Sequence, residues 1–131
     1  MKAQYIVINS LGTYYYSDKA MTELHRKNGP AVENANGTKF WFLNGKKHRT
    51  NGPAIEYSNG TNIWLLNGIR HRENGPAIEY SNGYKVWYIN GKRVSEQEHR
   101  DYFNPPKPKT ININGKVFTV EQLNDLIKTA E

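Results

Sequence analysis

The sequence predicts a mainly β protein: one elongated antiparallel sheet of stacked β-hairpin repeats, followed by a short capping helix and a small C-terminal hairpin plus helix. Three observations support this fold class. One block of sequence recurs three times, with the 23-residue spacing of His25, His48 and His71. Each copy holds two β-prone runs separated by Asn-Gly, a dipeptide typical of tight hairpin turns. Nine tyrosines, four phenylalanines and three tryptophans supply aromatic side chains that pack well across strands.

The three copies fill residues 25–93, and residues 1–24 hold a degenerate copy that serves as an N-terminal cap. In the middle copy the β-prone runs are PAIEY and NIWLL, with SNGT between them. A second Asn-Gly follows the tryptophan run in every copy, at Asn44, Asn67 and Asn90. We expect this second pair to end the strand and to open a polar loop that closes at Gly-Pro, which gives two strands per copy.

Stacked copies would set equivalent side chains in rows. Strands lie about 4.8 Å apart, so equivalent residues two strands on are roughly 9.6 Å apart. In the degenerate copy, matching Gly12 with Gly60 sets Tyr16 against Trp64. The tryptophans then form a ladder whose expected role is structural, with a ligand-stacking platform as the alternative: Trp41, Trp64 and Trp87.

The strict period stops after Arg93, and residues 94–104 predict a short helix that caps the sheet. Ser95 followed by Glu98 is a capping-box pattern that begins a helix. A cap is expected there because an exposed last strand would otherwise template aggregation. Residues 105–109 contain three prolines and directly follow Asn104. This segment predicts a stiff, extended linker.

Residues 110–131 predict a separate small unit. A hairpin around Asn114 precedes a helix that Thr119 caps, with Gln122 three residues later. The apolar side chains of this helix follow one stripe: Val120, Leu123, Ile127 and Ala130, with Leu126 at its margin. A helix of about a dozen residues is marginal alone, so the stripe should pack on its own hairpin, on the sheet or on a second copy. Self-association would use Leu123, Leu126 and Ile127.

The positive charge is concentrated in the repeats. The chain has a net charge of +6. Residues 25–93 hold eleven Lys or Arg and four Glu, whereas the two ends are nearly balanced. Such a segment is attracted to acidic proteins, nucleic acid or anionic lipid, and a solvated charged surface is the commoner structural explanation.

Catalytic chemistry finds little support in the sequence, and we expect a protein that is not an enzyme and holds no cofactor. The chain has no cysteine and no nucleophile motif or phosphate-cradling loop. A zinc site would need nitrogens within about 3.5 Å of one another, so rows about 9.6 Å apart exclude a metal at His25, His48 and His71. The same spacing excludes a retaining carboxylate pair, which needs about 5.5 Å, among Glu33, Glu56 and Glu79. We expect these glutamates to face neighbouring Arg and Lys.

A row of His-Arg pairs, supported by further cations, remains as the candidate binding strip along one edge of the sheet. Its members are His25, Arg26, His48, Arg49, His71, Arg72, Lys46, Lys47, Arg70, Lys92 and Arg93. The alternative is structural: each His-Arg pair organises its own loop by bonding turn carbonyls of the adjacent copy. Both can hold together, because arginine can pack its stem and still present its guanidinium.

The period and the pattern W-x-x-N-G-x-x-H-R-x-x-G-P-A resemble the MORN repeat, particularly its shorter bacterial and viral variant. The resemblance covers residues 25–93 and implies successive hairpins of one extended sheet, built on Trp41, Trp64, Trp87 and the Asn-Gly pairs. The chain differs from the eukaryotic pattern, which has glycine where Arg26, Arg49 and Arg72 stand here, so lipid binding is not carried over. In this respect the chain resembles the small stand-alone proteins with this repeat variant that are common in bacterial and tailed-phage genomes.

We therefore expect a protein-interaction module whose basic edge or aromatic sheet face binds an acidic protein. One form of it is a phage-encoded inhibitor or modulator of a host defence protein. The alternative is a nucleic-acid or nucleotide-binding protein that uses the same Arg and Lys strip. No stretch approaches the ~18 apolar residues of a membrane span, so we expect a cytoplasmic protein without membrane contact.

Overall fold

The computed structural model describes residues 4–130, which divide into two compact units. The first unit runs to His99 and contains the repeats, and the second begins at Arg100. The boundary falls within the helix Glu96–Phe103, and the two units are described separately below.

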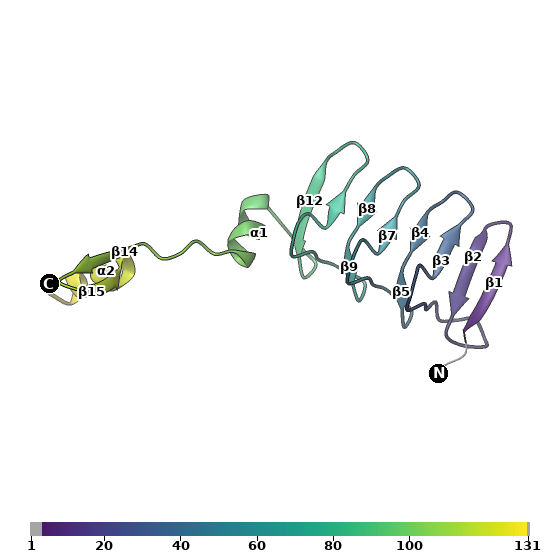
Figure 1. Ribbon diagram of the computed structural model, residues 1–131, viewed down its shortest axis with the longest axis horizontal. Coiled ribbons are helices and arrows are strands. Elements are labelled where there is room, and N and C mark those ends of the chain that lie inside the picture. Colours follow the sequence, from purple (N-terminus) through teal and green to yellow (C-terminus); the bar gives the residue numbers. More distant parts are fainter. Residues whose placement is uncertain (1–3, 131) are drawn as a thin grey trace. The chain divides into compact units, whose positions relative to one another are not determined.

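A nine-stranded antiparallel sheet forms the first unit, and its hairpins follow one another as rungs of a ladder (Figure 1). The strand order is β1-β2-β3-β4-β7-β8-β11-β12-β13, so every hairpin pairs with the hairpins before and after it in the chain. The strands are β1 (Tyr5–Asn9), β2 (Gly12–Tyr16), β3 (Val32–Asn34), β4 (Lys39–Phe40), β7 (Ile55–Glu56), β8 (Asn62–Ile63), β11 (Ile78–Glu79), β12 (Lys85–Ile89) and β13 (Lys92–Val94). The predicted fold class is confirmed.

The second Asn-Gly of each copy makes a tight turn, so the expectation of two strands per copy is wrong. In the first copy β5 (Phe42–Leu43) turns through Asn44 and Gly45 into β6 (Lys46–Lys47). The φ angles of these turn residues are 50° and 74°, the left-handed region that asparagine and glycine tolerate best. The next copy repeats this hairpin with β9 (Leu65–Leu66) and β10 (Ile69–Arg70). The polar loop therefore begins only after the second hairpin.

The register sorts side chains onto two faces, because residues paired across strands share a face and sequence neighbours alternate. We call one the aromatic face. Its central row is Val32, Phe40, Ile55, Ile63, Ile78 and Val86. The other, the arginine face, carries a charged row of Glu33, Lys39, Glu56, Asn62, Glu79 and Lys85. Acidic residues meet Lys39 on both sides in this row, which favours the observed register.

The core follows the ladder from copy to copy. Ala31, Ala54 and Ala77 are fully buried and occupy the same position in each copy. Ile55 and Leu65 pack beside Ala54, each less than a tenth exposed. The carbonyl of Ala54 accepts the N–H of Trp41 from the preceding copy at 2.8 Å, so the buried alanine also lies where two copies are bonded together.

Buried threonines tie successive turns together. Thr38 Oγ1 accepts a hydrogen bond from the backbone N–H of Ser58 at 3.1 Å, and Thr61 Oγ1 accepts one from Ser81 at 3.2 Å. Both threonines are buried. The third copy has Tyr84 at this position, and no further Ser-Asn-Gly turn follows it in the sheet.

In the degenerate copy, Tyr15 and not Tyr16 takes the place of tryptophan, so the expected alignment is wrong by one residue. The N–H of Tyr15 donates to the carbonyl of Ala31 at 2.8 Å, as the N–H of Trp41 does to Ala54. The cause lies in the turn. Gly12 is already part of strand β2, paired with Asn9, whereas its presumed equivalent lies inside a turn.

A helix follows the last strand, and its predicted cap is confirmed. α1 (Glu96–Phe103) begins after Ser95, whose hydroxyl accepts the N–H of Glu98 at 3.0 Å. His99 lies on this helix and is buried, with Nε2 2.6 Å from the carbonyl oxygen of Arg72. The helix thus bonds the loop of the third copy at the end of the ladder.

The second unit contains the predicted hairpin and helix. β14 (Thr110–Ile113) pairs with β15 (Lys116–Thr119), and α2 (Val120–Ala130) follows directly. Both arms of the predicted cap form: Gln122 N donates to Thr119 Oγ1 at 3.1 Å, and Thr119 N donates to Gln122 Oε1 at 2.8 Å. Residues 105–109 carry no helix or strand. Leu126 and Ile127 are exposed, so this unit leaves much of its apolar stripe uncovered.

None of the helices in residues 4–130 combines the length and the apolar character that crossing a membrane requires.

Candidate functional site

The arginines of the His-Arg pairs lie against aromatic rings of the preceding copy. Arg49 Cζ lies 4.0 Å from the centroid of the Trp41 ring. Its Nη1 donates to the carbonyl of Pro53 at 3.1 Å and lies 3.0 Å from Glu56 Oε1. Arg49 therefore connects the tryptophan of one copy to the loop and strand of the next, and the predicted glutamate pairing is confirmed here.

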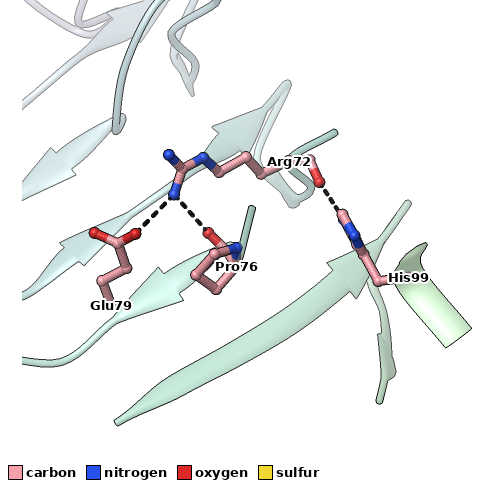
Figure 2. Close-up of polar contacts among 4 residues, drawn as sticks. All are labelled: Arg72, Pro76, Glu79 and His99. Carbon is pink, nitrogen blue, oxygen red and sulfur yellow. Dashed lines mark hydrogen bonds and ion pairs between the residues drawn. The ribbon is translucent and has the colours of Figure 1, made fainter. Parts of the chain in front are cut away.

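Arg72 repeats this arrangement one copy later. Its Cζ lies 3.8 Å from the Trp64 centroid, and Nη1 contacts Pro76 O at 3.1 Å and Glu79 Oε1 at 2.9 Å. Figure 2 shows the two contacts of this nitrogen and, at the backbone carbonyl of Arg72, the imidazole of His99. The side chain is 25% exposed, so it is packed by its neighbours but not withdrawn from solvent.

Arg26 differs from its two equivalents. It lies over Tyr15 at 4.0 Å and donates to Pro30 O at 3.1 Å. Within the described chain it forms no ion pair, although Glu33 stands where Glu56 and Glu79 stand in the later copies. The first arginine therefore keeps a positive charge that no carboxylate among residues 4–130 pairs with.

The glycine of each Gly-Pro lies directly under the guanidinium. A Cβ atom on Gly52 would lie 2.7 Å from Arg49 Cζ. On Gly29 it would lie 2.8 Å from Arg26 Cζ. A side chain here would displace the guanidinium from its ring, so glycine leaves room for the stacked arginine, a role that the sequence signals only through its recurrence before proline.

The histidines accept hydrogen bonds from the turns of the second hairpins. Nδ1 of His25 and of His48 accepts the N–H of Asn44 and of Asn67, each at 2.9 Å. His71 does the same at 3.0 Å. Nδ1 is therefore an acceptor, and the proton of the neutral ring lies on Nε2. The partners are turn N–H groups, not the turn carbonyls that the structural alternative named.

No candidate metal centre, meaning three or more His, Asp, Glu or Cys side chains grouped closely enough to hold an ion, occurs among residues 4–130.

The other cations of the predicted strip divide between the two faces. Lys47, Arg70 and Arg93 occupy equivalent positions and lie on the aromatic face. Lys47 Nζ is 5.7 Å from the Phe40 ring, and Arg70 Cζ is 5.4 Å from another ring, that of Tyr88. By the same register, Lys46 and Lys92 are exposed on the arginine face. The single strip along one edge that the sequence predicts is therefore two separate sets.

The three aromatic-face cations have no carboxylate partner in the part of the chain that the structure describes. Arg93 Nη2 instead donates to the hydroxyl of Tyr84 at 3.1 Å. The surrounding tyrosines are partly exposed, by 40% at Tyr57, 42% at Tyr80 and 55% at Tyr84. This face thus presents aromatic rings and free positive charge together, and sequence reasoning did not separate it from the His-Arg row.

Two equivalent grooves lie on the arginine face between successive loops. Groove 1 has a volume of about 460 Å³ and is lined by Arg26, Lys27, Asn28, Gly29, Trp41, Leu43, His48, Arg49, Thr50 and Asn51. Groove 2 has a volume of about 520 Å³ and is lined by Arg49, Thr50, Asn51, Gly52, Trp64, Leu66, His71, Arg72, Glu73 and Asn74. They share Arg49, Thr50 and Asn51, so both adjoin the middle loop.

Neither a family model, a curated protein nor a solved structure matches this chain. Inferences about its function therefore depend on the two faces.

Proposed function

We propose that this chain is a protein-interaction module, not an enzyme, and that it binds an acidic protein on its aromatic face. The observation that carries the proposal is the row of Lys47, Arg70 and Arg93, which lies among half-exposed rings and has no carboxylate partner within the described residues. Arg49 and Arg72, by contrast, are already neutralised within the sheet.

The chemistry of this face matches that of binding hot spots. Tyrosine and arginine are enriched there because they bury a large area and make directional hydrogen bonds from the same side chain. A cation that has no partner in the free protein gains one on binding, so it need not first break an internal ion pair. Such charges also accelerate encounter with an acidic partner.

The kind of partner follows from the resemblance to phage-borne repeats, and we propose a host defence or regulatory protein with an acidic surface. Self-association through Leu123, Leu126 and Ile127 belongs to the same proposal. Its support is the exposure of the last two, 55% and 61%, on a helix that follows a single two-stranded hairpin.

A charge-reversal experiment tests the proposed face. The partner is captured from host lysate on the immobilised chain, identified by mass spectrometry, purified and titrated against the variant Lys47→Glu, Arg70→Glu, Arg93→Glu. We expect at least a ~100-fold loss of affinity, since hot-spot truncations each cost ~2 kcal/mol or more and every 1.4 kcal/mol is tenfold.

The matched control reverses three exposed lysines outside this face, Lys46→Glu, Lys92→Glu and Lys116→Glu, so the net charge changes equally. Equal losses of affinity in the two variants would show that only net charge matters and would reject the aromatic face as the binding surface. Nucleic-acid binding is the competing outcome. It would appear as salt-dependent binding of mixed oligonucleotides at about 50 mM ionic strength that the aromatic-face variant abolishes.

A further inference from the structure

We infer that the two grooves of the arginine face form a second binding site, for an extended peptide segment in the polyproline II conformation with an acidic side chain in groove 1. This site lies on the opposite face from the proposed docking surface and uses none of Lys47, Arg70 or Arg93.

The spacing of the grooves selects the ligand conformation. Equivalent points of successive copies are two strands apart, roughly 9.6 Å. A polyproline II helix has three residues per turn and rises about 3.1 Å per residue, so side chains three apart share a side and lie about 9.3 Å apart. Side chains on one side of a β-strand are only about 6.6 Å apart, and those three apart point to opposite sides. Residues i and i+3 of a polyproline II segment therefore enter groove 1 and groove 2 together.

The groove linings suit such a segment. Each groove contains a tryptophan, Trp41 in groove 1 and Trp64 in groove 2, and proline-rich segments bind in aromatic-lined grooves. The polyproline II backbone makes no internal hydrogen bonds, so its carbonyls need donors. Asn51 lines both grooves and carries an amide that can donate, and His48 in groove 1 has its Nδ1 occupied and its N–H on Nε2.

The charges of the two grooves differ although their geometry repeats. Groove 1 is lined by Arg26 and Lys27 and by no carboxylate, and neither cation takes part in an ion pair within the described residues. In groove 2 both arginines already contact glutamates of the sheet, and Glu73 adds a negative charge. Groove 1 therefore favours a carboxylate, and groove 2 favours a cationic residue.

The charge difference between the two grooves fixes the register of a bound peptide on a periodic surface. A ligand on identical copies could shift by one copy and keep all its contacts, which would leave its register undefined. The third residue of each loop is Lys27, Thr50 and Glu73 in turn, and this is the loop position at which the copies differ. A segment with an acidic residue and, three positions later, a basic one therefore has a single favoured register.

Fluorescence anisotropy with labelled synthetic peptides tests the site. The probe is an octapeptide of six prolines with aspartate at position three and lysine at position six, blocked at both ends. We expect it to bind the full chain about tenfold more tightly than a peptide with aspartate at both positions or with lysine at both. Moving the lysine to position five or seven should cause a similar loss, because the spacing then departs from one turn.

Reversing one groove charge should reverse the preference. Lys27→Glu should favour the double-lysine peptide, and Glu73→Lys the double-aspartate peptide, by about tenfold in each case. Both substitutions are at exposed loop positions, and circular dichroism of each variant checks that the sheet is intact. Absence of binding to any peptide, indifference to spacing, or preferences that the variants do not exchange would overturn the site.

The aromatic-face variant separates this inference from the proposed function. Lys47→Glu, Arg70→Glu, Arg93→Glu should leave the peptide preferences unchanged, and loss of peptide binding in that variant would contradict the assignment to the arginine face. Oligonucleotides that displace the peptide regardless of the charge at position 73 would identify a polyanion surface instead and would also overturn it.

Discussion

Arg72 lies 3.8 Å over the ring of Trp64, and the same guanidinium is bonded to the loop and strand of its own copy. The arginine thereby joins two copies through one planar group. Cation–π stacking uses its face, while its Nη1 donates hydrogen bonds at its edge. The whole arrangement recurs at Arg49. Arg26 lies over Tyr15 and bonds its own loop at Pro30, without the ion pair to the strand.

Arg49→Ala should lower the free energy of unfolding by about 2 kcal/mol, because it removes a cation–π contact and hydrogen bonds from a packed site. Gly52→Ala should cost a similar amount, since its Cβ would lie 2.7 Å from Arg49 Cζ and would displace the guanidinium. The double variant should be no less stable than the worse single variant, because both lose the same contact. Urea unfolding followed by circular dichroism measures all three, and additive losses would contradict the assignment.

Thr61→Val should destabilise the chain by about 1–2 kcal/mol. The replacement has the same shape but removes the buried hydroxyl that accepts the N–H of Ser81. Thr50→Val, an exposed threonine of the same copy, is the matched control and should change stability by less than about 0.5 kcal/mol. Equal effects of the two substitutions would show that the threonine bond does not hold the turns together.

The Asp18 carboxylate should stabilise the loop after β2 in a pH-dependent way. The side-chain hydrogen bond from Thr22 first, and then the backbone N–H of Glu23, hold the pKa of Asp18 below its usual value of 3.8. Because the folded pKa is lowered, the stabilisation is fully present above pH 3.8 and is lost as the pH falls through the lower folded pKa. Amide hydrogen exchange of Thr22 should be faster in Asp18→Asn at neutral pH, and the difference should vanish in strong acid. A difference that persists there would contradict this account.

His99→Phe should loosen the last rung of the ladder, because the phenyl ring fills the space but cannot bond the carbonyl of Arg72. We expect a loss of about 1–2 kcal/mol and faster hydrogen exchange in β12 than in β3. His99→Gln provides the comparison, since its amide can still donate a hydrogen bond. If glutamine restores nothing relative to phenylalanine, the imidazole acts by packing alone.

Local chemistry made much of the ladder predictable. Asparagine followed by glycine takes up positive φ at both residues in the second hairpins and in the C-terminal hairpin, as at Asn67 and Asn114, both with φ of 50°. In the Ser-Asn-Gly turns only the glycine does so, as at Gly60 with φ of 92°. The helix caps at Ser95 and Thr119 were predictable for the same reason, because donor and acceptor are only three residues apart. Such features depend on neighbours in sequence and not on contacts between residues far apart in the chain.

The functional surfaces depend on contacts between residues far apart in the chain and were harder to predict. Lys47 and Arg49 are two residues apart, yet the first lies on the aromatic face and the second folds over Trp41 on the other. Strand β6 ends before His48, whose ring accepts a hydrogen bond from a turn nineteen residues later. No local pattern encodes that contact, so the sequence alone grouped all these cations in one strip. The shift from Tyr16 to Tyr15 has a similar origin, since it depends on where strand β2 begins.

The tyrosine at position 84 shows that near-identical copies are not interchangeable. The first two copies offer a threonine acceptor to a successor, whereas the third gives up this acceptor and uses its larger side chain to receive a bond from Arg93. The last copy thus lacks the residue with which the earlier copies bond the next turn. Deleting residues 48–70 would remove one complete rung, leave Thr38 facing Ser81, and keep both ends intact. The number of rungs, and with it the number of grooves, can therefore change by whole units while the rules at the two ends stay the same.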